Sequence, residues 1–84
     1  MQMYQKENLE TRSLPEIYGS LTNTQREDLA YALVTARCTK TRQTIWNWCT
    51  GKTAPQSPLV RNEVAKCVGR IIGARVMPGT LFPD

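Results

Sequence analysis

One eleven-residue stretch, residues 41–51, constrains the fold more than any other part of the chain. It reads Thr-Arg-Gln-Thr-Ile-Trp-Asn-Trp-Cys-Thr-Gly and predicts a short helix over residues 41–50. Thr41 can serve as its N-cap, because a threonine hydroxyl accepts a hydrogen bond from an otherwise unpaired amide of the first turn. Gly51 can end the helix in a left-handed conformation.

The apolar and polar residues of this predicted helix fall on opposite faces. Ile45, Trp48 and Cys49 are spaced i, i+3 and i+4, so they share one side that we expect to be buried. The other side carries amide, hydroxyl and aromatic groups, with a guanidinium at its flank. Its members are Arg42, Gln43, Trp46, Asn47 and Thr50. Such a helix suits insertion into the major groove of DNA.

Two helices are expected before this stretch. The sequence Ser-Leu-Pro-Glu at residues 13–16 is a capping box with a proline in the first turn, and it predicts a helix over residues 14–20. The sequence Thr-Gln-Arg-Glu at residues 24–27 is a second capping box, and the good helix formers after it predict a helix over residues 24–37. Only residues 38–40 then remain as a connection, which is typical of a helix-turn-helix motif.

One longer helix and a short tail follow the central stretch. The Ser-Pro pair at residues 57–58 is a typical helix start, and apolar residues continue at helical spacing until Gly73, which predicts a helix over residues 58–72. The tail, residues 74–84, contains two prolines and a glycine. It predicts a turn followed by an extended or single-turn segment, with Phe82 packed on the core.

Together these elements predict an all-α fold, a compact four- to five-helix bundle that contains a helix-turn-helix motif. Residues 13–84 form this domain, and the polar residues 1–12 form a flexible N-terminal arm. Trp48 is expected to be largely buried and Trp46 substantially exposed. The longest apolar run, residues 30–34, is far too short to span a membrane, and the arm lacks the apolar run of a signal peptide. We therefore expect a cytoplasmic protein with no membrane contact.

Charge is distributed unevenly along the chain. The net charge is +4, yet residues 1–36 carry three basic and five acidic groups, whereas residues 37–75 carry eight basic groups and one acidic group. A stretch of one sign around the central helix is what a surface that binds a polyanion needs. The alternative is a solvated basic face without a partner.

Catalytic and metal-binding functions find little support in the sequence. There is no histidine, and the three cysteines, Cys38, Cys49 and Cys67, are widely spaced, so neither a metal site nor a disulfide framework is expected. We expect reduced thiols in or near the core. No nucleophile–base spacing, paired carboxylates or glycine-rich phosphate loop occurs in the basic half. We therefore expect no enzyme activity and no cofactor.

The central residues resemble a known family. Residues 44–52, Thr-Ile-Trp-Asn-Trp-Cys-Thr-Gly-Lys, match the Thr-Ile-x-x-Trp-x-x-Gly-Lys pattern of the phage repressor and Cro-like helix-turn-helix group. The similarity covers roughly residues 28–83 and is greatest to short, stand-alone bacterial or prophage members. It continues at Pro55, Val64, Ala65, Leu81, Phe82 and Pro83. Thr39 stands where the family usually has the glycine of the turn.

The resemblance implies sequence-specific binding of double-stranded DNA and a role in transcription regulation, with the helix over residues 41–50 in the major groove. It places Ile45 and Trp48 in the core. The residues that it places toward the bases are Thr41, Arg42, Gln43, Trp46 and Asn47. Glutamine and asparagine can bond bidentately to adenine and arginine to guanine, and a tryptophan can press on a thymine methyl group or a sugar.

Our candidates for phosphate contacts are Lys40, Lys52 and Arg61, which would position the protein without reading sequence. A protein-interaction module on the same scaffold, without DNA binding, is the main alternative, because function does not follow from fold. An RNA target lacks support, since no platform of interleaved aromatic residues is present.

Oligomeric state is left open by the sequence. Family members often bind as dimers on two-fold sites, so a homodimer is an alternative. Certain apolar residues near the C-terminus would form either the dimer surface or part of the core: Ile71, Ile72, Val76, Met77 and Leu81.

Overall fold

The computed structural model describes residues 12–83, and within this range all regular secondary structure is helical. The helices are α2 (Leu14–Ser20), α3 (Asn23–Thr35), α4 (Arg42–Cys49), α5 (Pro58–Ile72) and α6 (Pro78–Leu81). The predicted all-α bundle is therefore confirmed. Nearly all of the N-terminal arm expected over residues 1–12, and Asp84, lie outside the described residues.

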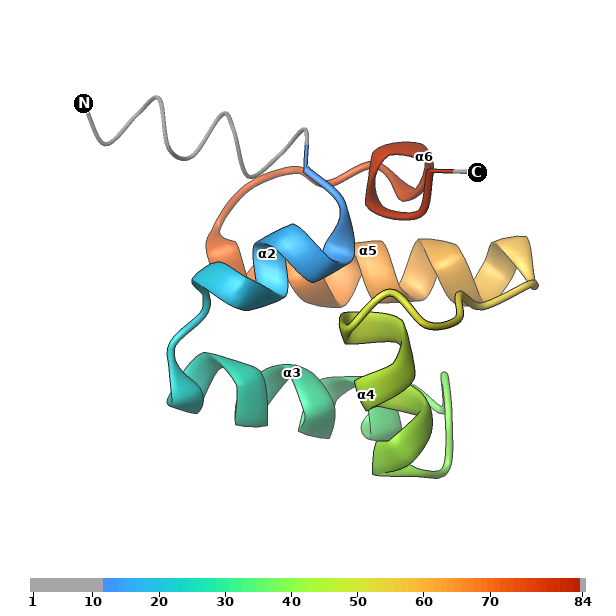
Figure 1. Cartoon of the computed structure of the whole chain (residues 1–84), viewed down its shortest axis with the longest axis horizontal. Coiled ribbons are helices and arrows are strands. Elements are labelled where there is room, and N and C mark those ends of the chain that lie inside the picture. Colours follow the sequence, from blue (N-terminus) through green and yellow to red (C-terminus); the bar gives the residue numbers. More distant parts are fainter. Residues whose placement is uncertain (1–11, 84) are drawn as a thin grey trace.

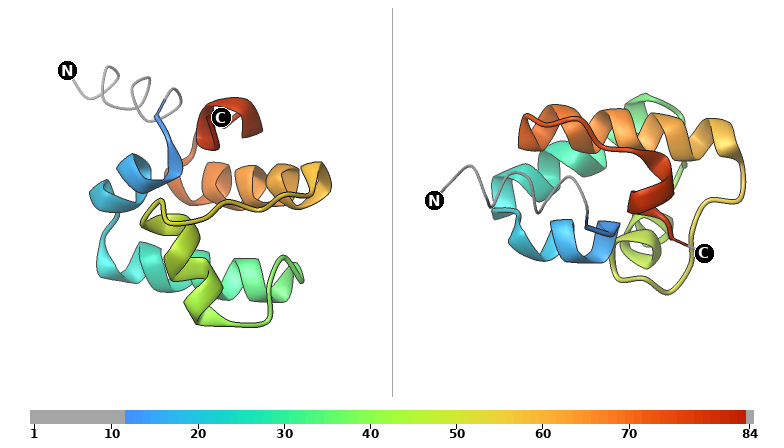
Figure 2. Two further views of the ribbon diagram at one scale, coloured as in Figure 1. Left: turned by 45° about the vertical axis from the view of Figure 1, so that its right-hand side comes forward. Right: turned by 90° about the horizontal axis from the view of Figure 1, so that it is seen from above.

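Helix α3 is central to the packing, because it contacts both α5 and α4. Helix α3 packs against α5 on one side and α4 on the other, and α4 also contacts α2. Figure 1 shows α3 and α4 together below α2 and α5, and the view from above in Figure 2 places α5 on the opposite side of the molecule from α2. The one-turn helix α6 folds back against α5. This arrangement leaves one long side of α4 without a covering helix.

Every described helix contributes to a single apolar core. The side chains with less than 2 % exposure include Leu14 and Ile17 from α2, Leu29 and Leu33 from α3, and Val64 and Val68 from α5. Phe82 is buried, which confirms the predicted packing of the tail. The apolar residues that were candidates for a dimer surface mostly close the core, because Val76 and Leu81 are buried in it and Ile71 and Ile72, which are partly buried, pack against it. Met77 alone of the five is exposed.

The start of α3 corrects the second predicted capping box. Thr22, rather than Thr24, is the N-cap: its hydroxyl accepts a hydrogen bond from the Gln25 amide at 3.2 Å, and the Gln25 side chain accepts one from the Thr22 amide at 2.9 Å. Both Thr-x-x-Gln and Thr-x-x-Glu fit the capping pattern. The earlier start adds a backbone bond from the Arg26 amide to the Thr22 carbonyl and leaves the Glu27 carboxylate free of capping.

Three helices, α3, α4 and α5, end in the same backbone closure. In each, an amide donates to the carbonyl five residues earlier, and these bonds run from Cys38 to Leu33, from Lys52 to Asn47 and from Ala74 to Gly69. The residue before each donor has a positive φ, namely Arg37 (60°), Gly51 (83°) and Gly73 (70°). This is the Schellman type of helix end, in which glycine is favoured because it has no Cβ. The predicted roles of Gly51 and Gly73 are confirmed.

The connection between α3 and α4 is longer than the sequence pattern predicts. Helix α3 ends at Thr35 rather than at residue 37, so residues 36–41 join the two helices. The left-handed residue of the turn is Arg37, not Thr39. The Thr39 hydroxyl instead accepts a hydrogen bond from the Thr41 amide at 3.3 Å and so holds the entrance to α4. Helix propensity favours continuing α3 through Arg37. The helix nevertheless ends earlier, because Arg37 adopts a left-handed conformation and the Cys38 amide bonds to the Leu33 carbonyl.

The tail crosses α5 at Gly69. A Cβ at this position would lie 2.7 Å from the Ala74 carbonyl oxygen, well inside van der Waals contact. The bare backbone of Gly69 therefore permits the chain to double back directly after Gly73. This close approach carries Val76, Leu81 and Phe82 onto the core.

Candidate nucleic-acid interface

Helix α4 is fixed at both of its ends. At its start, the Thr41 hydroxyl accepts a hydrogen bond from the Thr44 amide at 3.3 Å and lies 2.8 Å from the Thr44 hydroxyl. At its end, Gly51 turns the chain away, and a Cβ there would lie 3.2 Å from the Cγ of Pro15 in α2. Thr41, predicted to face the bases, thus uses its hydroxyl for the start of the helix.

One side of α4 is buried and the other is open. Ile45, Trp48 and Cys49 are 4 %, 7 % and 2 % exposed, whereas Trp46 is 49 % exposed. The predicted difference between the two tryptophans is therefore confirmed. The apolar spacing in the sequence carried this information, since an i, i+3, i+4 pattern sets one face of a helix against the core.

Two predicted base-reading amides lie together on the open side. The Gln43 side-chain NH₂ donates to the Asn47 side-chain oxygen at 3.2 Å. Gln43 keeps its own carbonyl oxygen and a second N–H, which is the acceptor and donor pair that adenine requires. Asn47 is partly buried and supports Gln43 from one turn further along the helix.

Arg42 forms an ion pair with a carboxylate that the sequence analysis did not identify. Its Nη2 atom lies 3.2 Å from the Glu27 Oε2 atom, and the two side chains are 71 % and 67 % exposed. The pair joins the first residue of α4 to α3, and the partners are fifteen positions apart in the sequence. No local spacing rule connects residues so far apart, and placing the second capping box two residues late assigned Glu27 to a cap.

A groove runs beside Trp46 between α2, α3 and α4. Its volume is about 280 Å³, and its lining includes Tyr18, Arg26, Glu27, Arg42, Gln43 and Trp46. The Tyr18 and Trp46 rings meet edge to face with centroids 6.5 Å apart. The Arg26 guanidinium lies 4.6 Å from the centre of the Tyr18 ring, and its Nε donates to the Tyr18 carbonyl at 3.1 Å. Tyr18, Arg26 and Glu27 were not among the residues that we predicted for this site.

The candidate phosphate contacts separate into two kinds. Lys40 and Lys52 are exposed and lie just before and just after α4. Arg61 is partly buried, because its Nε donates to the Pro55 carbonyl at 2.6 Å and its guanidinium lies 5.8 Å from the centre of the Phe82 ring. Arg61 therefore connects the loop after α4 to α5 and the tail, whereas the two lysines lie in the segments directly before and after α4.

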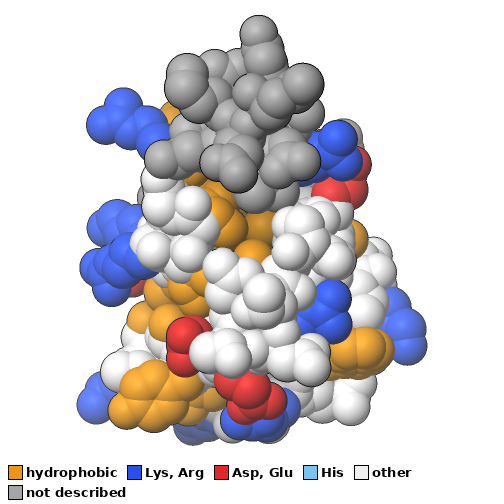
Figure 3. All heavy atoms as spheres, turned by 90° about the vertical axis from the view of Figure 1, so that its left-hand side faces the viewer, with side chains coloured by type: hydrophobic (Ala, Val, Ile, Leu, Met, Phe, Trp, Pro, Cys, Tyr) orange, Lys and Arg blue, Asp and Glu red, His pale blue; other side chains and the backbone are white. Residues whose placement is uncertain are grey.

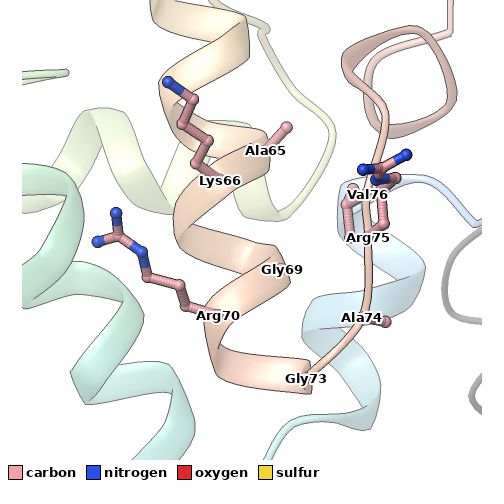
Figure 4. Close-up of a pocket in the computed structure, with 8 residues that line it drawn as sticks. All are labelled: Ala65, Lys66, Gly69, Arg70, Gly73, Ala74, Arg75 and Val76. Atoms are coloured by element: carbon pink, nitrogen blue, oxygen red, sulfur yellow. The ribbon is translucent and has the colours of Figure 1, made fainter.

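The remaining basic groups do not gather at α4. Lys66, Arg70 and Arg75 border a hollow of about 530 Å³ between α5 and the tail that follows it. Figure 4 shows Lys66 and Arg70 projecting to one side of α5 and Arg75 to the other, so the three cationic groups do not converge. Figure 3 shows basic side chains spread over the edges and the lower end of another face, with acidic side chains beside them at the lower end and at the upper right.

The cysteine thiols take no part in this surface. Burial raises the pKa of Cys49 to about 12 and raises the pKa of Cys67 and Cys38 above the usual value, so all three are protonated at neutral pH. Across residues 12–83, no three histidine, cysteine or acidic side chains are grouped so as to hold a metal ion. The same residues contain no helix with the length and apolar character needed to cross a membrane.

Comparison with protein-family models, with curated proteins and with solved structures found no match to this chain. What the chain binds must therefore be inferred from the open side of α4 and the groups around it.

Proposed function

We propose that this protein binds double-stranded DNA sequence-specifically and regulates transcription, with α4 in the major groove. The observation that carries the proposal is the division of α4 into a buried and an open side. Ile45, Trp48 and Cys49 fix the helix in the core. A fixed helix can present side chains to base edges at defined positions, which direct reading of sequence requires.

The open side of α4 has the chemistry for such reading. Gln43, braced by Asn47, has the donor and acceptor that adenine needs, and Arg42 at the N-terminal end has the paired donors that guanine needs. Trp46 offers an apolar surface for a thymine methyl group. The N-terminal part of a recognition helix is the part that reaches furthest into the groove.

Lys40 and Lys52 supply the positioning contacts in this proposal. They lie at the two ends of α4, so both can meet phosphates that border the same stretch of groove. The resemblance of residues 44–52 to short bacterial and prophage regulators supports this proposal, and a cytoplasmic location is part of it.

A protein-interaction module is the second candidate. Three large apolar side chains outside α4 favour it, because Tyr31, Leu59 and Met77 are 74 %, 77 % and 57 % exposed. They come from three separate segments, and a homodimer would use one or more of them. The two candidate functions differ in their response to salt. Binding through phosphates releases counterions and weakens steeply as salt is added, whereas an apolar protein interface does not.

Selection of bound sequences from a random duplex pool tests the proposal directly. We expect enrichment of a common sequence that contains adenine and guanine positions read by α4. The selected duplex should then bind with an affinity that falls linearly on a log–log plot against salt concentration. Absence of any enriched sequence, together with an affinity indifferent to salt, would favour the protein-interaction module.

A further inference from the structure

We propose that Glu27, on α3, is a specificity-determining positioning residue that directs Arg42 of α4 toward guanine. The inference rests on the proposed DNA binding and extends it to a residue outside the recognition helix. It starts from the ion pair between Arg42 Nη2 and Glu27 Oε2 at 3.2 Å, which lies in the groove beside Trp46.

Both partners stand on fixed backbone. Glu27 lies two residues before Leu29, which is fully buried, and Arg42 lies three residues before the buried Ile45. The pair therefore joins two helices whose relative position the core determines. Glu27 is the sole acidic side chain that lines this groove, which it shares with two arginines, Arg42 and Arg26, and it is paired with Arg42.

The ion pair has little part in holding the protein together. Both side chains are more than two-thirds exposed, and exposed ion pairs add little stability. Its effect is on what Arg42 can bind. A guanidinium has five N–H donors in a rigid fork, so a carboxylate at one edge leaves the other edge free to donate to the O6 and N7 atoms of guanine.

The Glu27 carboxylate also weakens the binding of Arg42 to phosphate, which is the competing ligand on the duplex. An arginine without an acidic neighbour binds any phosphate along the duplex, and such contacts carry no sequence information. The negative charge of Glu27 offsets that of Arg42 and repels phosphate oxygens. Specificity gains when a competing interaction is made worse, so Glu27 separates the reading of guanine from general attraction to DNA.

The test compares Glu27→Gln with the unaltered protein on two duplexes. One is the selected sequence, and the other replaces its guanine with adenine. Loss of the carboxylate should raise the affinity for a random duplex about fivefold, because one repulsion next to phosphates is gone. The preference for guanine over adenine should fall about tenfold, within the range of one bidentate base contact.

Glu63→Gln is the matched control. Glu63 also forms an exposed ion pair, with Lys66 at 3.5 Å, but on α5 and away from the groove. This variant loses the same charge, so it should change the affinities for both duplexes by the same small factor. In an Arg42→Ala background, Glu27→Gln should no longer alter the preference for guanine.

An equal gain in affinity for both duplexes, with the preference unchanged in Glu27→Gln, would show that Arg42 contacts phosphate and would overturn the inference. If the unaltered protein enriches no sequence at all, the proposed function fails first, and the inference falls with it. Far-ultraviolet circular dichroism and urea unfolding of each variant verify that the fold is kept.

Discussion

The Tyr18 and Trp46 rings meet edge to face, with centroids 6.5 Å apart and planes at 84°, and so tie α2 to the open side of α4. Trp46 is thus half exposed and yet held in place, whereas Trp48, two residues on, is buried. The two tryptophans of one short helix therefore have different roles. One contributes to the core, and the other contributes to the proposed DNA surface.

Replacing each tryptophan by alanine should separate these roles. Trp48→Ala should lower the free energy of unfolding by about 3–5 kcal/mol, as large aromatic truncations in a core do. Trp46→Ala loses the aromatic pair and should cost only about 0.5–1.5 kcal/mol. Urea unfolding measures both values. Equal losses, or equal access of acrylamide to the two indoles in single-tryptophan variants, would contradict the assignment.

The left-handed residue at the end of α3 gives a stabilising substitution. Arg37 has a φ of 60°, which costs an L-residue energy that glycine does not pay. Arg37→Gly should therefore raise the free energy of unfolding by about 0.5–1 kcal/mol. Thr39→Gly is the control, because Thr39 accepts a hydrogen bond from the Thr41 amide, and its loss should be destabilising. The reverse order of stability would mean that the turn is centred on Thr39.

At acidic pH, the free energy of unfolding should depend on the protonation of the Glu16 carboxylate. The amide and the hydroxyl of Ser13 donate to Glu16, and these bonds lower the pKa of its carboxyl below the ordinary 4.5. A lowered pKa in the folded state means that the contribution is fully present above the unfolded value and is lost as the pH falls through the folded value. Glu16→Gln should therefore lose less stability than the unaltered protein between about pH 6 and about pH 3.

Nuclear magnetic resonance titration of the Glu16 carboxyl checks the cause. Ser13→Ala removes the hydroxyl donor but keeps the backbone amide, which makes the larger contribution. The pKa of Glu16 should therefore rise only part of the way to its ordinary value. A full return would assign the effect to the hydroxyl alone.

The two lysines that flank α4 should differ from Arg61 in their effect on DNA binding. Lys40→Ala and Lys52→Ala should each weaken binding to every duplex alike and make the slope of log affinity against log salt shallower by about one. Arg61→Ala should mainly destabilise the fold, since Arg61 bonds to the Pro55 carbonyl. If both lysine variants keep the original slope, the surface that contacts DNA lies elsewhere.

The paired amides give the prediction on sequence preference. Gln43→Ala should lose about 1–3 kcal/mol of binding free energy on the selected duplex, the range for a bidentate base contact, and much less on random duplex. Asn47→Ala should lose less, because Asn47 acts through its bond to Gln43. Competition between selected and random duplex at one salt concentration measures both. A double variant Gln43→Ala/Asn47→Ala with unchanged preference would exclude the two amides as base-reading residues.

The sequence predicted helix boundaries accurately wherever a single capping signal was present. The capping box at Ser13, the Ser-Pro start at residues 57–58 and the glycine stops at Gly51 and Gly73 each place a helix boundary within one residue. The start of α3 was misplaced because two overlapping capping boxes compete there. Its end was misplaced because an arginine occupies a position at which the sequence rules look for glycine.

The surroundings of the candidate site were beyond local rules. Spacing within α4 identified its open side, since periodicity alone decides which residues share a face. The partners that α2 and α3 bring to that side, Tyr18, Arg26 and Glu27, depend on how three helices pack. Likewise, the sequence marks Arg61 as basic, but only the fold shows that the Pro55 carbonyl engages it.

Two opposing physical constraints act on Gly69, namely helix propensity and the close approach of the tail. Within the last turn of α5, which ends at Ile72, almost any residue forms helix better than glycine. Beneath the returning tail, however, even a methyl group would collide with the Ala74 carbonyl oxygen. Among natural variants of this protein, we therefore expect position 69 to tolerate no side chain unless the tail that follows changes with it. Position 69 and the tail residues that lie against it should therefore vary together or not at all. The residue that helix propensity favours least at this position is thus the one that the path of the C-terminal tail requires.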